Sequence, residues 1–209
     1  MRVPWRKTIG RACAALLIIV ACAACGPKVP PLPKLSAQDV VLAFGDSLTY
    51  GTGAAEHESY PAVLQQLIGR QVVRAGVPGE VSAQGLERLD EVLEEVKPRI
   101  VIVCLGGNDL LRKIPDAQIA ANLRAILRAV KAKGAAAVLV GVPRPQLLSA
   151  PPGFYAEIAR EFGVPYEGAA VKDVLYSPKL KSDPIHPNAA GYRVMAEAIG
   201  KVLHQAGAL

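Results

Sequence analysis

Short apolar runs alternate with amphipathic stretches along most of this chain, from about residue 36 to the C-terminus. Runs of four to eight apolar residues are typical of buried strands, whereas apolar residues repeated every three or four positions are typical of helices. The predicted strands cover residues 40–44, 71–77, 100–105, 137–142 and 164–166. The predicted helices cover residues 60–68, 86–96, 119–130, 154–162 and 194–202. This order predicts an α/β fold, a three-layer α/β/α sandwich around a five-stranded parallel sheet.

The length and charge of the chain fit one globular domain behind a basic leader. The 209 residues are enough for one sizeable core, and no internal repeat is present. The formal net charge of +6 includes four basic residues of the leader: Arg2, Arg6, Lys7 and Arg11. Without them 20 basic residues face 18 acidic ones, a net charge of +2, and no run of basic residues remains. These numbers argue against nucleic acid as a partner.

The first residues have the pattern of an export signal. A basic start is followed by an apolar stretch over residues 12–24, which is too short to span a bilayer. Its end, Ala-Ala-Cys-Gly at residues 23–26, resembles a bacterial lipoprotein signal with Cys25 as the lipidated residue; Cys22 is the alternative. Residues 1–24 are then the signal peptide. An ordinary secretory leader with incidental cysteines is the competing interpretation.

The stretch after this junction is rich in proline. Residues 26–35 hold four prolines, which favour extended polyproline II, so residues 25–37 are predicted to be a lipidated cysteine and a linker about 30 Å long. Residues 38–209 are left as the folded domain. Neither candidate cysteine precedes an aspartate, which by resemblance to Gram-negative lipoproteins implies the periplasmic side of the outer membrane. A soluble periplasmic or secreted protein is the alternative.

Three candidate site residues follow predicted strands. Ser47 comes after the first strand, Gly79 after the second and Asn108 after the third. Asp183 and His186 precede the last helix. In parallel sheets the carboxyl ends of the strands meet at one edge, where ligands bind. All of these residues are therefore expected to share one site.

Their chemistry indicates acyl transfer. A serine hydroxyl needs a base, and histidine is the natural residue type for that task, which makes His186 the candidate. Asp183, three residues away, is expected to orient the imidazole. The backbone N–H groups of Ser47 and Gly79 and the side-chain amide of Asn108 are candidate donors to an oxyanion. Ser47 as a helix cap and His186 as a surface histidine are the structural alternatives for the single residues.

These segments resemble the GDSL, or SGNH, hydrolase family over about residues 38–205. The motifs are Gly-Asp-Ser-Leu at 45–48, Gly-Gly-Asn-Asp at 106–109 and Asp-x-x-His at 183–186. The resemblance implies a flavodoxin-like fold, catalytic Ser47, Asp183 and His186, and an oxyanion hole of Ser47, Gly79 and Asn108. It is closest to the arylesterase, thioesterase I and lysophospholipase L1 branch. Arg74 departs from that branch, which often has Asn there, and is expected to alter only the rim of the site.

The predicted function is cleavage of carboxylic esters, with a small-molecule or lipid ester as substrate, through an acyl-serine intermediate. A carbohydrate O-acetyl esterase is the alternative enzyme, and a non-catalytic binding lipoprotein is the alternative of another class. After Cys25, the predicted lipidated residue, no His-x-x-x-His or Cys-x-x-Cys pattern occurs, so neither a metal nor a cofactor is implied.

Several other residues have a structural interpretation. Asp46 and Asp109 are expected to cap turns, Cys104 to be a small buried hydrophobe, and His57 and His204 to have no catalytic role. Residues 143–145, Pro-Arg-Pro, either wall the acyl pocket or form a structural turn.

Overall fold

The computed structural model describes Met1, residues 29–144 and residues 150–209. Its centre is one sheet of five parallel strands in the order β2-β1-β3-β4-β5. The prediction of a five-stranded parallel sheet is confirmed. The strands are β1 (Val40–Gly45), β2 (Gln71–Gly76), β3 (Ile100–Cys104), β4 (Ala136–Val140) and β5 (Tyr166–Glu167).

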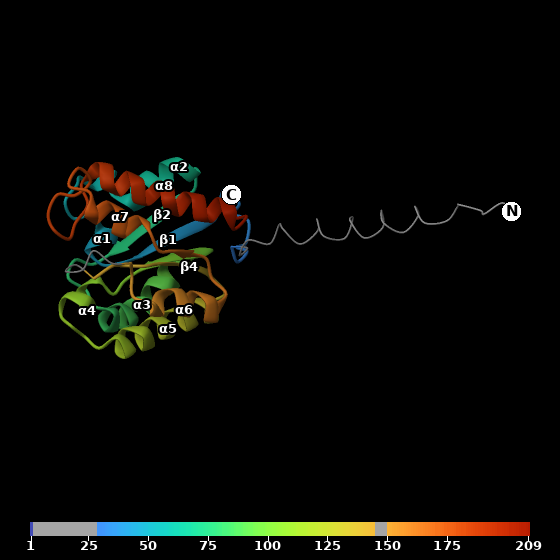
Figure 1. Ribbon diagram of the computed structural model, residues 1–209, viewed down its shortest axis with the longest axis horizontal. Helices are drawn as coiled ribbons and strands as arrows, with labels where there is room; N and C mark the ends of the chain where they lie inside the picture. The colour runs from blue at the N-terminus through green and yellow to red at the C-terminus, as the bar shows by residue number, and fades with distance from the viewer. Residues whose placement is uncertain (2–28, 145–149) are drawn as a thin grey trace.

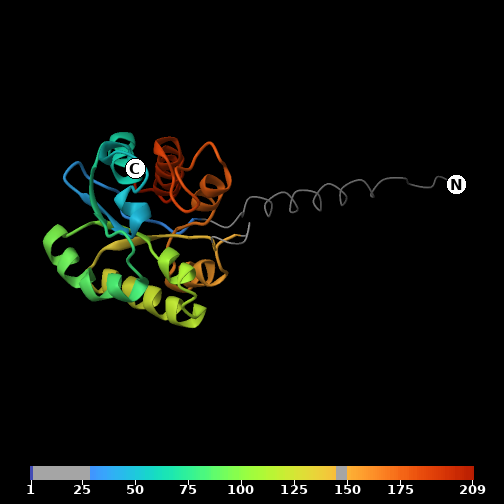
Figure 2. The same cartoon turned by 90° about the vertical axis from the view of Figure 1, so that its left-hand side faces the viewer.

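Helices cover both faces of this sheet, which confirms the three-layer sandwich. On one face lie α2 (Tyr60–Ile68), α7 (Ala170–Tyr176) and α8 (Ala189–Gln205), as Figure 1 shows. On the other lie α3 (Ser82–Val96), α5 (Asp116–Ala132) and α6 (Phe154–Phe162), and Figure 2 shows the two layers from the side. There are also three short helical turns: α1 (Ser47–Tyr50) follows β1, the 3₁₀ turn η2 (Glu56–Glu58) precedes α2, and α4 (Gly107–Leu111) follows β3.

The composition of the strands explains the double cover. All five residues of β3 are buried, and β1 is buried from Val41 to its end. A strand that is apolar on both faces must be covered on both sides. Each covering helix packs one apolar face against the sheet. In α3, for example, Leu89 and Leu93 are buried while the glutamates are exposed to solvent. Each such leucine contributes about 1.5–3 kcal/mol relative to exposure.

The linker prediction is wrong for residues 29–37, which belong to the folded domain. The N–H of Leu32 donates to the carbonyl of Ala206 and the N–H of Leu35 to that of Ala208, both at 2.8 Å. Both leucine side chains are buried in the main core. Polyproline II has three residues per turn and leaves its N–H groups unbonded. Two leucines three apart therefore share one face, and their free N–H groups can bond to the C-terminal segment.

The signal peptide, Cys22 and Cys25 lie outside the described residues, so these predictions stay predictions. Across residues 29–144 and 150–209, the structure has no helix that is both long enough and apolar enough to cross a bilayer.

Candidate active site

Ser47 lies just after the carboxyl end of strand β1, as the first residue of α1. Asp46 caps this turn, because its carboxylate accepts the N–H of Leu48 at 3.0 Å. The strand ends in Gly45, where an added Cβ would lie 2.2 Å from the carbonyl oxygen of Cys104. Only glycine fits this close approach of β1 to β3, and the chain can then turn so that the hydroxyl of Ser47 faces outward.

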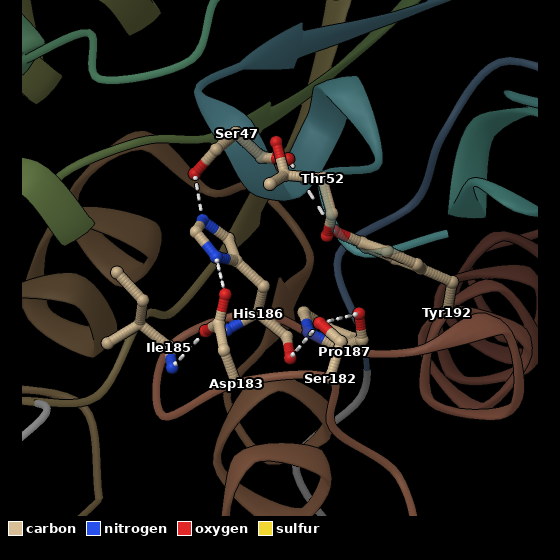
Figure 3. Close-up of polar contacts among 8 residues, drawn as sticks. All are labelled: Ser47, Thr52, Ser182, Asp183, Ile185, His186, Pro187 and Tyr192. Carbon is tan, nitrogen blue, oxygen red and sulfur yellow. Dashed lines mark hydrogen bonds and ion pairs between the residues drawn. The ribbon is translucent and has the colours of Figure 1, made fainter. Parts of the chain in front are cut away.

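His186 and Asp183 reach Ser47 from the loop before α8 (Figure 3). The Nε2 of His186 lies 3.0 Å from the Oγ of Ser47. Its Nδ1 lies 2.7 Å from one carboxylate oxygen of Asp183. The other oxygen of Asp183 accepts the backbone N–H groups of Ile185 and His186, each at 2.8 Å. One hydrogen-bonded chain therefore runs from the carboxylate through the imidazole to the hydroxyl.

The loop that carries the histidine is held by its own polar groups. The backbone N–H of Ser182 donates to the carbonyl of His186 at 2.9 Å, and its hydroxyl contacts the carbonyls of His186 and Pro187 at 3.2 Å. Asn188 then caps α8 through the N–H of Gly191. These bonds fix the direction of the imidazole before any substrate binds.

The two carboxyl groups near Ser47 have opposite pKa shifts. Burial of Asp183 opposes its ionisation, but the hydrogen bonds from His186 and from two backbone N–H groups outweigh this effect and lower the pKa of Asp183. Complete burial raises the pKa of Asp46 to about 7, helped by the nearby carboxylates of Glu80 and Asp109. Asp183 is thus the carboxylate that stays charged beside the imidazole.

The three predicted oxyanion donors lie at neighbouring strand ends. Gly79 is the third residue of a turn closed by the N–H of Glu80 and the carbonyl of Val77 at 3.2 Å, and its φ of +80° marks a type II turn with Pro78 second. Asn108 is the second residue of α4. Its side-chain amide donates to the carbonyl of Glu80 at 3.0 Å and makes a longer contact, 3.5 Å, with the carboxylate of Asp46. Within the described residues, the N–H groups of Ser47 and Gly79 donate to no other group.

A pocket opens beside this constellation. Ser47, Asn108 and His186 line it on one side together with Asp46. Its empty volume is about 360 Å³, including solvent at the mouth. The apolar walls come from five different segments: Leu48, Leu111, Val142, Pro143, Leu175 and Ile185. Pro143 thus walls the pocket, whereas Pro145 lies outside the described residues.

The remaining candidates lie elsewhere. Neither His57 nor His204 lines the pocket, and Cys104 is a buried free thiol, as predicted. Arg74 donates to the carbonyl of Tyr50 and pairs with Glu56 without lining the pocket. Asp109 caps the N-terminus of α3 although it lies 27 residues further along the chain than Ser82. Its carboxylate accepts the backbone N–H and the hydroxyl of Ser82, the first residue of α3. No cluster of His, Cys, Asp or Glu among the described residues has the arrangement of a metal site.

Sequence reasoning missed the residues behind the site. Glu80 and Arg88 form a bidentate ion pair under the Gly79 turn. The buried Tyr192 of α8 donates to the carbonyl of Thr52 at 2.7 Å, next to the Ser47 turn (Figure 3). A glutamate and an arginine eight positions apart give no local signal that they pair. A tyrosine six residues after the histidine is a sequence signal that could have been used.

Comparison with known proteins gives consistent results. A model of the GDSL-like lipase/acylhydrolase family matches residues 43–194. Thioesterase 1/protease 1/lysophospholipase L1 of Escherichia coli K12 is 34% identical over 178 residues, which cover 81% of this chain and 86% of that protein. Esterase TesA of Pseudomonas aeruginosa is 30% identical, with 82% and 91% covered. The crystal structure of AlinE4, an SGNH-hydrolase family esterase, superposes with a TM-score of 0.63 at 30% identity, over 83% of this chain and 98% of that one.

Proposed function

Because this chain belongs to the GDSL-like lipase/acylhydrolase family and is a carboxylic ester hydrolase, we propose that Ser47, His186 and Asp183 are its catalytic triad. Family membership confirms the resemblance that the sequence motifs indicate. The observation that carries the triad is the unbroken chain of contacts at 3.0 and 2.7 Å from hydroxyl to imidazole to carboxylate. It has the order of groups that activates a serine nucleophile.

In the proposed acylation step, the Nε2 of His186 takes the proton of Ser47 as its Oγ bonds to the ester carbonyl carbon. Asp183 stabilises the resulting imidazolium and holds Nδ1 as the protonated nitrogen. His186 then gives the proton to the leaving alcohol or thiol as the C–O or C–S bond breaks. Water, deprotonated by the same histidine, hydrolyses the acyl-serine and restores the hydroxyl of Ser47.

The tetrahedral intermediate in both half-reactions carries a negative oxygen. We propose that the N–H groups of Ser47 and Gly79 and the amide of Asn108 bind it. Two of these are backbone donors that bond to no other described residue, so they need not break existing bonds to serve. Loss of one such donor typically lowers kcat by about 10²–10³-fold.

The apolar pocket supports an acyl chain as the group that lies beside Ser47. Its side-chain walls, Leu48, Leu111, Val142, Pro143, Leu175 and Ile185, have no hydrogen-bonding groups. A sugar would leave its hydroxyls unbonded against such walls, which is costly. We therefore infer that acyl esters and thioesters, and not acetylated carbohydrates, are the substrates. A panel of p-nitrophenyl esters and of thioesters with increasing acyl length tests this inference. A kcat/KM that is higher on acetylated oligosaccharides than on any of these acyl substrates would contradict it.

The nucleophile is tested by Ser47→Ala. We expect loss of ester hydrolysis and of fluorophosphonate labelling with an unchanged circular dichroism spectrum. The exposed Ser36 supplies a matched control, since Ser36→Ala should keep both activities. Most of the wild-type rate remaining in Ser47→Ala would show that the assignment is wrong.

The base is tested by pH. A general base must be unprotonated to accept the proton of Ser47, so kcat/KM should fall as the pH is lowered. A flat profile between about pH 5 and pH 8, where imidazole titrates, would exclude a histidine base.

A further inference from the structure

Arg88 of α3 lies directly behind the proposed oxyanion hole. Its Nε and one Nη donate to the two carboxylate oxygens of Glu80 at 2.5 and 2.7 Å. The Glu80 side chain is only 4% exposed and that of Arg88 23%. A bidentate pair of this kind is strong and strictly oriented. Removing one member leaves the other as a buried charge without a partner.

The same guanidinium also holds the ends of two strands. It donates to the carbonyl of Ala75 in β2 at 3.0 Å and to that of Gly45 in β1 at 3.3 Å. Its carbon lies 4.2 Å from the centre of the Phe44 ring, a cation–π contact. Because Gly45 is two residues before Ser47, Arg88 connects the nucleophile strand to the segment that carries Glu80.

Glu80 in turn touches both remaining oxyanion donors through its own backbone. Its N–H closes the turn that presents Gly79, at 3.2 Å from the carbonyl of Val77. Its carbonyl accepts the amide of Asn108 at 3.0 Å. A displacement of Glu80 would therefore move the N–H of Gly79 and turn the amide of Asn108 together.

We propose that Glu80 and Arg88 are positioning residues for the oxyanion hole, and that their ion pair keeps Gly79 and Asn108 at a fixed distance from Ser47. This inference rests on the proposed function of Gly79 and Asn108 as donors. Donors stabilise the oxyanion only when they lie about 2.7–3.1 Å from it, so small displacements act on the transition state more than on the bound ester. Neither side chain lines the substrate pocket.

The test is Arg88→Met, which keeps the length of the side chain and removes its donors. The kcat is measured per active site, with sites counted by fluorophosphonate labelling carried to completion. We expect kcat to fall about 10–100-fold, part of the effect of losing a donor, with KM changed less than about threefold. The Ki of a boronic acid, which forms a tetrahedral adduct with Ser47, should rise in parallel. Arg88→Lys, which cannot form the bidentate pair, should be intermediate.

Two controls separate positioning from general damage. Arg124→Met removes another helix arginine that pairs with a glutamate, Glu161 at 2.7 Å, but on the outer surface of α5 and α6; it should keep wild-type kcat. The acid limb of the pH profile should be unchanged in Arg88→Met, because His186 and Asp183 are untouched.

An unchanged kcat per site, or a rise in KM alone, would overturn the proposal. If Arg88→Met does not fold, Glu80→Gln decides by the same measurements, since it keeps the side-chain volume and removes the charge. Failure of the proposed function looks different: wild-type turnover would be absent or would survive Ser47→Ala.

Discussion

Asp46 is a fully buried carboxyl group next to the nucleophile, and its pKa is raised to about 7 mainly by burial. In an unfolded chain the same group titrates near 3.8. Between about pH 4 and pH 7 the folded state therefore binds more protons than the unfolded state. By linkage, this group makes the free energy of unfolding fall as pH rises through that window, and the loss persists above it.

Asp46→Asn should remove this pH dependence while its side-chain oxygen still accepts the N–H of Leu48. We expect the free energy of unfolding of the variant, relative to that of the wild type, to increase from pH 5 to pH 8. The increase is at most roughly 4 kcal/mol, the value for a pKa shift of about three units. Urea unfolding at both pH values measures the difference. Asp173→Asn, at an exposed carboxylate, is the control; a difference that does not grow with pH would contradict the raised pKa.

Asp183 decides which nitrogen of His186 carries the proton. In Asp183→Asn the amide oxygen can still accept backbone N–H groups, but the amide nitrogen would face Nδ1 and make it an acceptor. Nε2 would then be protonated and unable to take the proton of Ser47. We expect kcat to fall about 10³–10⁴-fold, as for other triad carboxylates, with little change in KM. Steady-state kinetics beside Asp173→Asn measures this; a loss below tenfold would exclude the orienting role.

At the scale of elements, α8 supports the nucleophile turn from behind. Tyr192, which is completely buried, donates to the carbonyl of Thr52 at 2.7 Å and lies 3.5 Å from that of Ser47. The helix that begins beside His186 thus also holds the segment that follows Ser47. The hydroxyl of Tyr192 thus adds a direct link between the two halves of the site.

Tyr192→Phe should leave a buried carbonyl without its donor. We expect a loss of about 1–2 kcal/mol, a decrease in Tm of roughly 2–8 °C for a domain of this size. Thermal unfolding followed by circular dichroism measures it. Tyr50→Phe, at a side chain 46% exposed, should leave Tm unchanged, and equal Tm values for the two variants would contradict the buried bond.

The elements found from the sequence are those with long periodic patterns. The strands were predictable, and so were the helices at residues 60–68 and 154–162, because burial against the neighbouring layer sets the spacing of their apolar residues. The helix α7 was not, since it has only seven residues and its N-cap residue, Ala169, has no side-chain acceptor. Its first N–H groups donate to the carboxylate of Glu167 instead. It is stabilised by packing of its buried apolar residues against the core, which a local pattern does not reveal.

The site residues likewise divide into those that the sequence could place and those that it could not. The order of Ser47, Asn108, Asp183 and His186 could be placed at one sheet edge from topology alone. The Glu80–Arg88 pair could not, because it depends on where the Gly79 turn directs a side chain relative to the first turns of α3. Burial of Leu32 and Leu35 was also missed, since prolines around them indicate an extended chain without showing what it packs against.

At the scale of the whole molecule, the chain enters the domain at the end opposite the site. The helix α8 starts beside His186 and runs for 17 residues, a length of about 25 Å. Beyond the C-terminal end of α8, the carbonyls of Ala206 and Ala208 accept the N–H groups of Leu32 and Leu35. In Figure 1 the C-terminus and the segment after residue 29 lie together at one end, and α1 and α4 at the other.

We propose that the protein is anchored through a lipidated Cys25, or Cys22, with its domain in the periplasm. Cys25 precedes the fixed segment at residue 29 by four residues, so a chain of this length reaches at most about 14 Å. The anchored domain would then stand with the mouth of its pocket facing away from the bilayer. Several acyl chains on one cysteine exceed the two signals needed for stable attachment.

The anchor predicts a membrane-bound native protein whose N-terminal peptide begins at a modified cysteine. Intact-mass analysis of that peptide should show the added diacylglycerol and amide-linked chain. Cys25→Ser should release the protein from the membrane fraction if Cys25 is the lipidated residue, with Cys22→Ser as the matched variant. Both should hydrolyse a soluble ester at the wild-type rate, because the site is at the far end of the domain. An unmodified, soluble chain that begins at a residue other than cysteine would contradict the anchor and leave the hydrolase assignment intact.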